Sequence, residues 1–349
     1  MSNFYTLKVS QVRKLTPDSV AVSLRVPEAL RETFSFLAGQ YVTFRHFKDG
    51  EEIRRAYSIA SRPGEEDLTV GIKKVPGGAF SVYANETLRA GDSLEVMPPE
   101  GRFIYQPESG SGCVLALAAG SGITPIMSII KTALADRSDS RVVLAYGNRS
   151  PQETMFRDEI EQLKSEYADR FTVYYLFSRD REDGSLFGRI ESATVNFITR
   201  NKHQDLSFDR CYLCGPQAMI EMAEETLIGQ GVPKERIFHE LFTAAEVADT
   251  LKDELEGKTA LTVTLDGVQH QLVMDQKSLV LDAVIRAKID APYSCQGGVC
   301  STCIARVTEG EASMVKNQIL TPGEIAEGLI LTCQAHPTTP VLKVDYDDV

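Results

Sequence analysis

Four cysteines near the end of this 349-residue chain constrain its fold more than any other feature. They have the spacing C-x4-C-x2-C-x29-C. Plant-type [2Fe–2S] clusters are held at this spacing, because one tight loop provides three thiolates and a distant segment provides the fourth. We therefore predict an iron–sulfur cluster in the last third of the chain. Its ligands are Cys295, Cys300, Cys303 and Cys333.

A zinc site is the alternative interpretation of the cysteines. Cys211 and Cys214 form a second C-x2-C pair, which together with Cys300 and Cys303 formally makes a four-cysteine zinc site. Residues 211–214 lie in an apolar run that predicts a strand, however, and side chains three apart in a strand point to opposite faces. We therefore favour the iron–sulfur cluster over zinc.

Hydrophobic periodicity divides the chain into three regions. Residues 1–107 contain short strands separated by turn residues, a pattern typical of an antiparallel barrel. Residues 108–243 alternate strands with helices, which predicts an α/β domain around a parallel sheet. Residues 244–257 are acidic and lack a long apolar run, so we expect a linker there. Residues 258–349 form a small third domain that carries the cysteine loop.

A glycine turn in the second region suggests a nucleotide site. Gly120, Gly122 and Thr124 follow an apolar strand and precede a helical pattern. This is the context that a dinucleotide-binding turn requires, because the glycines admit a pyrophosphate and the helix N-terminus favours its charge. The alternative is a tight strand–helix turn without a ligand.

The ends of the next two predicted strands bear on the choice of nucleotide. A Rossmann-type site for NAD expects an acidic residue about 20 positions after the turn. The sequence has Arg149 and, one strand later, Ser178 and Arg179 in such places. Arginine pairs well with a 2′-phosphate, so we predict NADPH, with NADH as the alternative. Ordinary solvated arginines would explain the same pattern.

Charge and hydropathy exclude several functions. The net charge is −12, from 49 acidic and 37 basic residues, which disfavours binding to nucleic acids or anionic membranes. The N-terminal residues lack the apolar stretch of a secretory signal, and glycine and proline interrupt the most apolar window, residues 113–130. We therefore expect a cytoplasmic protein without a membrane span.

The order of the motifs resembles the ferredoxin–NADP reductase family. Arg55-Ala56-Tyr57-Ser58 is followed by Gly77-Gly78-Ala79-Phe80-Ser81, then by the glycine turn, then by Cys214-Gly215-Pro216, and the cysteine loop resembles a plant-type ferredoxin fused behind them. The resemblance implies an antiparallel β-barrel flavin domain, an α/β nucleotide domain and an α+β (β-grasp) ferredoxin domain. Residues 54–59, 94–99 and 146–149 are most similar to reductase subunits of phenylacetyl-CoA epoxidase systems.

The resemblance also implies FAD as the flavin and gives it a set of contacts. Arg55 would pair with its phosphate, Tyr57 would stack on its ring and Ser58 would bond near the flavin N5. The implied FAD-binding residues are Arg55, Tyr57, Ser58, Ile72, Lys73, Gly78, Phe80, Ser81 and Phe242.

Hydride transfer is implied to involve both domains. Thr124 and Cys214 would flank the nicotinamide, and Glu240 would approach the flavin ring. The catalytic set is Tyr57, Ser58, Thr124, Cys214 and Glu240. The nucleotide-binding set is Gly120, Gly122, Thr124, Arg149, Ser178, Arg179, Gly215 and Pro216.

Three redox sites in one chain predict an electron-transfer enzyme. NAD(P)H gives two electrons together and a [2Fe–2S] cluster accepts one, so a flavin must lie between them. The chain has no Glu-x-x-His pair of the di-iron type, so oxygen chemistry would belong to a partner. We expect a reductase for the oxygenase component of a multicomponent system, with a di-iron phenylacetyl-CoA epoxidase or a similar aromatic-degradation oxygenase as the leading candidate. A Rieske oxygenase, a desaturase or a hybrid-cluster protein is the alternative partner. A third hypothesis is a non-enzymatic regulator whose cluster senses redox state. The flavin and nucleotide motifs argue against it, because such a regulator would need neither a hydride donor nor a hydride acceptor.

The third region also suggests how a partner is attracted. Residues 258–349 carry a net charge of −4, whereas residues 296–302 of the cysteine loop carry no charge. We therefore expect electrostatic steering of a basic partner toward a neutral contact at the loop.

Overall fold

The computed structural model describes residues 4–48, 50–106, 112–241 and 257–349. These residues fall into two units, a larger one within residues 5–242 and a smaller one built mainly from the C-terminal residues. Most of the expected linker, residues 244–257, lies outside the described residues, as does Phe242. No helix of the described ranges is long and apolar enough to cross a membrane.

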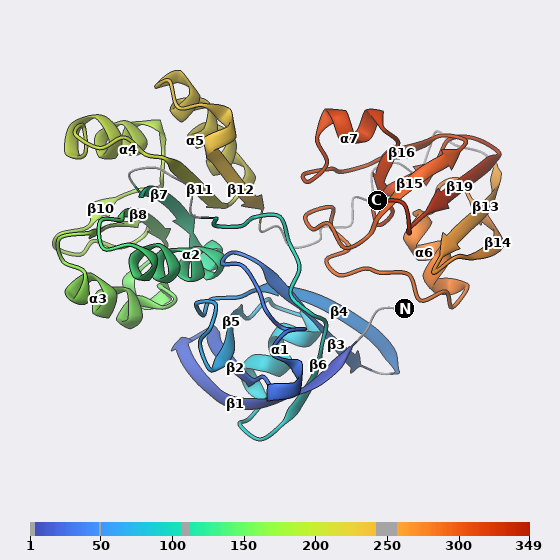
Figure 1. Cartoon of the computed structure of the whole chain (residues 1–349), viewed down its shortest axis with the longest axis horizontal. Helices are drawn as coiled ribbons and strands as arrows, with labels where there is room; N and C mark the ends of the chain where they lie inside the picture. Colours follow the sequence, from blue (N-terminus) through green and yellow to red (C-terminus); the bar gives the residue numbers. More distant parts are fainter. Residues whose placement is uncertain (1–3, 49, 107–111, 242–256) are drawn as a thin grey trace. The chain divides into compact units, whose positions relative to one another are not determined.

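The first part of the larger unit is an antiparallel barrel, as predicted (Figure 1). Its strand order is β4-β3-β6-β1-β2-β5. A bridge between Ile59 and Val70 joins the two edge strands, which closes the sheet. Inward-facing apolar residues such as Leu7 and Val22 fill it. The elements are β1 (Tyr5–Thr16), β2 (Ser19–Arg25), η1 (Glu28–Leu30), β3 (Tyr41–Lys48), β4 (Glu51–Ser58), β5 (Asp67–Lys73), α1 (Ala79–Glu86) and β6 (Ser93–Val96).

The second part is a parallel sheet with strand order β10-β9-β8-β7-β11-β12. Figure 1 shows α2 and α3 on one face and α4 and α5 on the other. Residues 142–146 of β8 are buried without alternation, because helices cover both faces. The strands are β7 (Cys113–Ala119), β8 (Arg141–Asn148), β9 (Phe171–Phe177), β10 (Leu186–Phe187), β11 (Arg210–Gly215) and β12 (Ile237–Leu241). The helices are η2 (Gly120–Gly122), α2 (Ile123–Asp136), η3 (Pro151–Glu153), α3 (Arg157–Glu166), α4 (Ser192–Asn196), η4 (Phe197–Lys202), α5 (Gln217–Gly229) and η5 (Lys234–Arg236).

The C-terminal unit is an α+β domain. Its five-stranded sheet has the order β14-β13-β19-β15-β17, in which β13 and β19 are parallel and the other neighbours antiparallel. Residues such as Leu261, Val284 and Leu331 form its core. The elements are β13 (Lys258–Leu265), β14 (Val268–Asp275), α6 (Val280–Arg286), β15 (Ile304–Glu309), β16 (Ala312–Met314), α7 (Pro322–Ala326), β17 (Leu329–Leu331), β18 (Ala335–Pro337) and β19 (Val341–Asp345).

Candidate active site and cluster loop

A polar pair joins the end of β4 to β12. The Ser58 hydroxyl donates a hydrogen bond to Glu240 Oε2 at 3.3 Å, and the Ser58 side chain is buried. Burial raises the pKa of the Glu240 carboxyl to about 8, which the bond from Ser58 partly opposes. The raised pKa favours the neutral, protonated form of the Glu240 carboxyl. Two residues 182 positions apart, both expected in the catalytic set, meet here.

Cys214 lies beside this pair. It occupies β11 in register with Glu240 on β12. A Cβ atom added to Gly122 would stand 2.3 Å from the Cys214 carbonyl oxygen, so only glycine lets the turn before α2 approach β11 this closely. Gly122, expected to face a pyrophosphate, thus packs on the Cys214 backbone. Burial, followed by the charge of Glu240, raises the pKa of the Cys214 thiol well above its usual value.

Thr124 occupies the first turn of α2, directly against the barrel. Its hydroxyl donates to the Ser121 carbonyl at 3.1 Å, and its side chain is buried. A Cβ atom on Gly71 of β5 would lie 2.6 Å from Thr124 Cγ2 and 2.8 Å from the Phe156 ring. Gly71 is thus a site residue that the sequence motifs did not reveal. A glycine inside an apolar strand was the signal for such a close approach.

Aromatic rings form a cluster in the barrel core next to Ser58. The centroids of Tyr57 and Phe80 lie 5.6 Å apart, and Phe44 stacks on Phe80 at 5.1 Å. Phe44 and Phe80 are fully buried in the barrel core, whereas Tyr57 is only half-buried, so within this group the Tyr57 ring is the one that could pack on a planar ring system such as isoalloxazine. The Ser81 hydroxyl accepts the Val75 N–H at 3.1 Å and thereby fixes the turn before α1.

The other residues expected around a flavin are placed as follows. Ile72 is fully buried, and its carbonyl accepts a bond from Asn85 at 3.2 Å. Gly78 precedes the first residue of α1. The Arg55 guanidinium donates to the carbonyl of Arg54 at 2.7 Å.

A cavity of about 580 Å³ lies at the carboxyl ends of the parallel strands. This volume and position are typical of a nucleotide site in an α/β fold. Six expected nucleotide-binding residues line it, namely Gly120, Arg149, Ser178, Arg179, Gly215 and Pro216. Lys73, expected along the flavin, lines it as well.

The lining charges of the cavity suit an anionic ligand. The basic residues are Lys73, Arg149, Arg179 and Arg189, against the acids Glu153 and Glu191. Arg149 is exposed and pairs with Glu153 at 3.9 Å. Arg189 and Glu191 lie in a loop and Glu153 lies in the short helix η3, and no motif marks either segment, so the three were missed from the sequence.

The four cysteine thiols of the C-terminal unit gather in one place. Hydrogen bonds from Cys300, then from Cys333, together with the backbone N–H of Gly297, hold the pKa of the Cys295 thiol well below its usual value. The Gly297 nitrogen lies 3.3 Å from Cys295 Sγ, and the Cys333 thiol also reaches Cys303. Four converging thiols with a backbone donor fit a [2Fe–2S] cluster.

The zinc alternative is not supported by the placement of the other pair. Cys214 packs in the core between the parallel sheet and α2, whereas Cys211, three residues away on β11, points to the opposite face. Among the residues that the structure describes, no three His, Cys, Asp or Glu side chains are placed so that together they could hold one metal ion. A binuclear cluster does not need such a group, since each iron takes two cysteines. Cys113 is buried in β7.

Gln334 ties the cluster loop to the segment of the fourth cysteine. Its amide nitrogen donates to the Gln296 carbonyl at 3.0 Å and to the Cys333 carbonyl at 2.7 Å. Behind the loop, Tyr346 donates to Thr332 at 2.9 Å, and Thr332 donates to the Cys303 carbonyl at 2.9 Å. The cysteine spacing alone did not reveal these bonds, since each depends on the folded loop.

Three family models match in the order of the three regions. Residues 6–105 match the oxidoreductase FAD-binding domain, residues 116–225 the oxidoreductase NAD-binding domain and residues 263–338 the 2Fe-2S iron-sulfur cluster binding domain. The protein therefore uses FAD, a nicotinamide nucleotide and a [2Fe–2S] cluster, which confirms the predicted cofactor classes.

Similar proteins have the same layout over their whole length. The chain is 39% identical over 355 residues to a subunit of the 1,2-phenylacetyl-CoA epoxidase of Escherichia coli, covering 99% of both chains. It is 33% identical to the ferredoxin reductase component of 3-ketosteroid-9-alpha-monooxygenase of Rhodococcus rhodochrous, covering 97% of this chain and 96% of the relative. Phthalate dioxygenase reductase has the same fold, with a TM-score of 0.64 at 21% identity and 98% of both chains covered. The chain thus belongs to the ferredoxin–NADP reductase family, in the branch of NAD(P)H-dependent flavin oxidoreductases that carry a C-terminal [2Fe–2S] ferredoxin domain.

Proposed function

We propose that this protein is the reductase component of a multicomponent oxygenase. The observation that carries the proposal is the meeting of Ser58, Cys214 and Glu240 beside the cavity at the strand ends, in a chain whose C-terminal unit brings four thiols together. When bound, the flavin converts a two-electron hydride donor into single electrons that a [2Fe–2S] cluster passes on.

A phenylacetyl-CoA epoxidase system is the partner that the similarity favours. The 39% identity to a component of that enzyme exceeds the 33% to a ketosteroid monooxygenase reductase, at almost complete coverage of both. The proposed partner is accordingly a di-iron oxygenase of aromatic degradation, and the proposed site of action is the cytoplasm. A Rieske oxygenase, a desaturase or a hybrid-cluster protein is the alternative.

The domain limits and the roles of the residues form part of the proposal. The FAD domain is residues 1–107, the nucleotide domain 108–243, the linker 244–257 and the cluster domain 258–349. Arg55, Tyr57 and Ser81 hold FAD, and Arg149 and Arg179 favour NADPH by pairing with its 2′-phosphate. Phe242, outside the described residues, completes the expected flavin contacts.

The chain's own side chains prepare the site for hydride transfer. Ser58 and a protonated Glu240 place a neutral hydrogen-bonding pair where a negative carboxylate would repel incoming electron density. The closely packed backbones at Gly71 and Gly122 hold Thr124 and Cys214 in place and leave little room for water. A dry, fixed site of this kind would favour hydride transfer once a flavin and a nicotinamide nucleotide are bound.

Reconstitution tests the proposal. The purified protein, loaded with FAD and cluster, is mixed with NADPH and a phenylacetyl-CoA epoxidase lacking its reductase, and epoxide formation is measured. Product that depends on this chain supports the proposal. Rapid reduction of ferricyanide without any epoxide would leave the reductase activity intact and contradict the assigned partner.

A further inference from the structure

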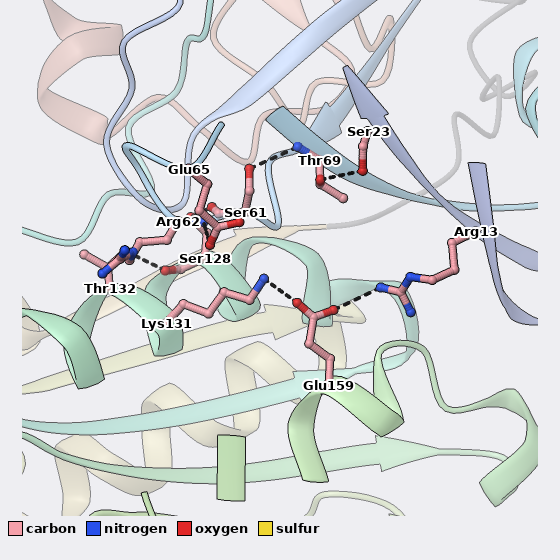
Figure 2. A network of polar contacts seen from close by, with 10 residues as sticks. All are labelled: Arg13, Ser23, Ser61, Arg62, Glu65, Thr69, Ser128, Lys131, Thr132 and Glu159. Carbon is pink, nitrogen blue, oxygen red and sulfur yellow. Dashed lines mark hydrogen bonds and ion pairs between the residues drawn. The ribbon is translucent and has the colours of Figure 1, made fainter. Parts of the chain in front are cut away.

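One face of α2 bears a row of residues with contacts beyond the helix. Thr124, Ser128 and Lys131 are spaced by four and three positions, so they follow one another along the same face. Thr124 packs on Gly71 of the barrel, whereas Ser128 and Lys131 make the polar contacts shown in Figure 2. The N-terminus of the same helix forms the glycine turn that lines the nucleotide cavity. The row therefore links the nucleotide site mechanically to the barrel.

From this row we propose that Ser128 and Glu159 are positioning residues, which fix α2 on the barrel and thereby set the distance over which hydride is transferred. The inference rests on the proposed hydride transfer from nicotinamide to flavin. Neither side chain is among the residues assigned to the cofactors.

Ser128 makes a buried bond from α2 to the barrel. Its hydroxyl donates to the Ser61 carbonyl at 2.6 Å, and both residues are fully buried. Ser61 is itself tied to β5, because its hydroxyl accepts the Thr69 N–H at 3.0 Å. Thr69 Oγ1 in turn lies 2.8 Å from Ser23 Oγ on β2 (Figure 2).

These bonds complete a closed path. Thr69 lies two residues before Gly71 on β5, and Gly71 meets the first turn of α2. The helix is thus attached to the same strand twice, by van der Waals contact at Thr124 and through Ser61 at Ser128. A helix held at two points one turn apart can neither slide along its axis nor rotate without breaking one of them.

Glu159 adds a third attachment, one turn further along α2. One oxygen of its carboxylate forms an ion pair with Nη2 of Arg13 on β1 at 3.1 Å. The other oxygen forms an ion pair with Nζ of Lys131 on α2 (Figure 2). Glu159 lies on α3, so a single side chain connects a barrel strand with two helices of the nucleotide domain. Lys131 is 14% exposed but Arg13 is 43% exposed, and exposed ion pairs contribute little. We therefore expect Glu159 to matter less than Ser128.

Hydride transfer is sensitive to such attachments. Reacting atoms must come within about 3–3.5 Å, and a displacement of about 1 Å can cost on the order of 100-fold in rate. Ser58 belongs to the barrel, whereas Thr124 and the glycine turn belong to the nucleotide domain. A small shift of α2 would alter the distance between the rings but leave each cofactor's own contacts in place.

The test is transient reduction of FAD in the holoprotein under anaerobic conditions. Ser128→Ala is expected to lower the limiting rate of reduction by NADPH roughly tenfold, and Glu159→Gln about two- to threefold. FAD content and the dissociation constant of NADPH, read from the concentration dependence, should change less than about twofold. The isotope effect with nucleotide deuterated at the transferred position should stay at or above the wild-type value.

Matched variants serve as controls. Ser140→Ala removes another fully buried serine hydroxyl, one with no hydrogen-bond partner within the described ranges. Glu161→Gln changes an acid on α3 that pairs with Lys164 of the same helix at 3.3 Å. Both controls should reduce FAD at about the wild-type rate.

The outcomes are distinguishable. If Ser128→Ala and Ser140→Ala give equal rates, or if the slower reduction follows entirely from lost FAD or weaker NADPH binding, the positioning role is wrong. If neither NADPH nor NADH reduces the FAD of the wild-type protein, the proposed function fails and the inference falls with it.

Discussion

The cluster loop and the proposed hydride-transfer site are built in different ways. Three of the four expected cluster ligands lie within nine consecutive residues, 295–303, and their spacing alone identifies the cofactor. The proposed hydride-transfer site takes Ser58 from a barrel strand, Thr124 from a helix and Glu240 from an edge strand. A local site survives as a motif in the sequence, whereas a dispersed site depends on how the elements pack. A substitution of a ligand in the loop should therefore abolish electron transfer to the partner. A substitution that disturbs packing should instead lower the rate of hydride transfer without abolishing it.

The sharpest test of this comparison is Cys300→Ser. The variant should lose its cluster and all electron transfer to the partner oxygenase, because one iron lacks a ligand, but it should keep NADPH–ferricyanide activity. Iron and sulfide analysis, visible spectra and the two activities measure this. Cys113→Ala, a buried cysteine outside the loop, is the control. Partner turnover by a variant without iron would disprove the proposed electron path.

Gly71→Ala should produce the next largest effect. The added methyl would stand 2.6 Å from Thr124 Cγ2, so β5 or α2 must shift. We expect FAD reduction to slow by on the order of 100-fold while cluster content stays normal. Gly229→Ala, where nothing lies within 4 Å, should leave the rate unchanged. Equal rates for the two variants would show that the close contact at Gly71 is not needed.

Arg179→Ala tests the assignment of the nucleotide. A lost charge-assisted bond to the 2′-phosphate costs roughly 1.5–3 kcal/mol, so kcat/KM for NADPH should fall by roughly 10–150-fold. The value for NADH should hardly change. Equal losses with both nucleotides would instead place Arg179 on a phosphate that they share, or give it a structural role.

The raised pKa of Glu240 predicts a dependence of stability on pH. The ordinary pKa is 4.5 and the folded value is about 8, so between these values the folded state holds more protons than the unfolded state. The stabilisation is complete below pH 4.5 and is lost as the pH rises through 8. In the Glu240→Gln variant, the midpoint of unfolding of the holoprotein should depend less on pH over this range than it does in the wild type. Parallel curves for the wild type and the variant would show that Glu240 does not titrate there.

The smallest expected effect is that of salt on partner binding. The Debye length falls from about 30 Å at 0.01 M to about 10 Å at 0.1 M salt, which should slow association with a basic partner. Hydride transfer inside the protein should stay nearly constant over the same range. Association that is independent of salt would favour apolar contact at the loop over electrostatic steering.

The sequence by itself determined the elements and the cofactors. The short strands of the first region, the apolar strand before the glycine turn and the cysteine spacing each depend on neighbours in the chain, and the structure has β2, β7 and the converging thiols there. Gly120 of the glycine turn and the strand-end Arg149 and Arg179 line the cavity at the strand ends, and their roles toward a nucleotide remain part of the proposal. Local propensity and ligand spacing are properties of short segments, so they remain visible before the chain folds.

Only the tertiary structure decided how the dispersed site is held together. The Ser58–Glu240 bond, the contact of Gly71 with Thr124 and the Ser128–Ser61 bond join residues separated by 182, 53 and 67 positions. The sequence of each segment does not predict which distant residue it will contact, because these contacts follow from the closure of the barrel and from the position of α2 against it. Glu153, Arg189 and Gln334 were overlooked for the same reason, since a residue outside any motif acquires its role from what the fold brings beside it.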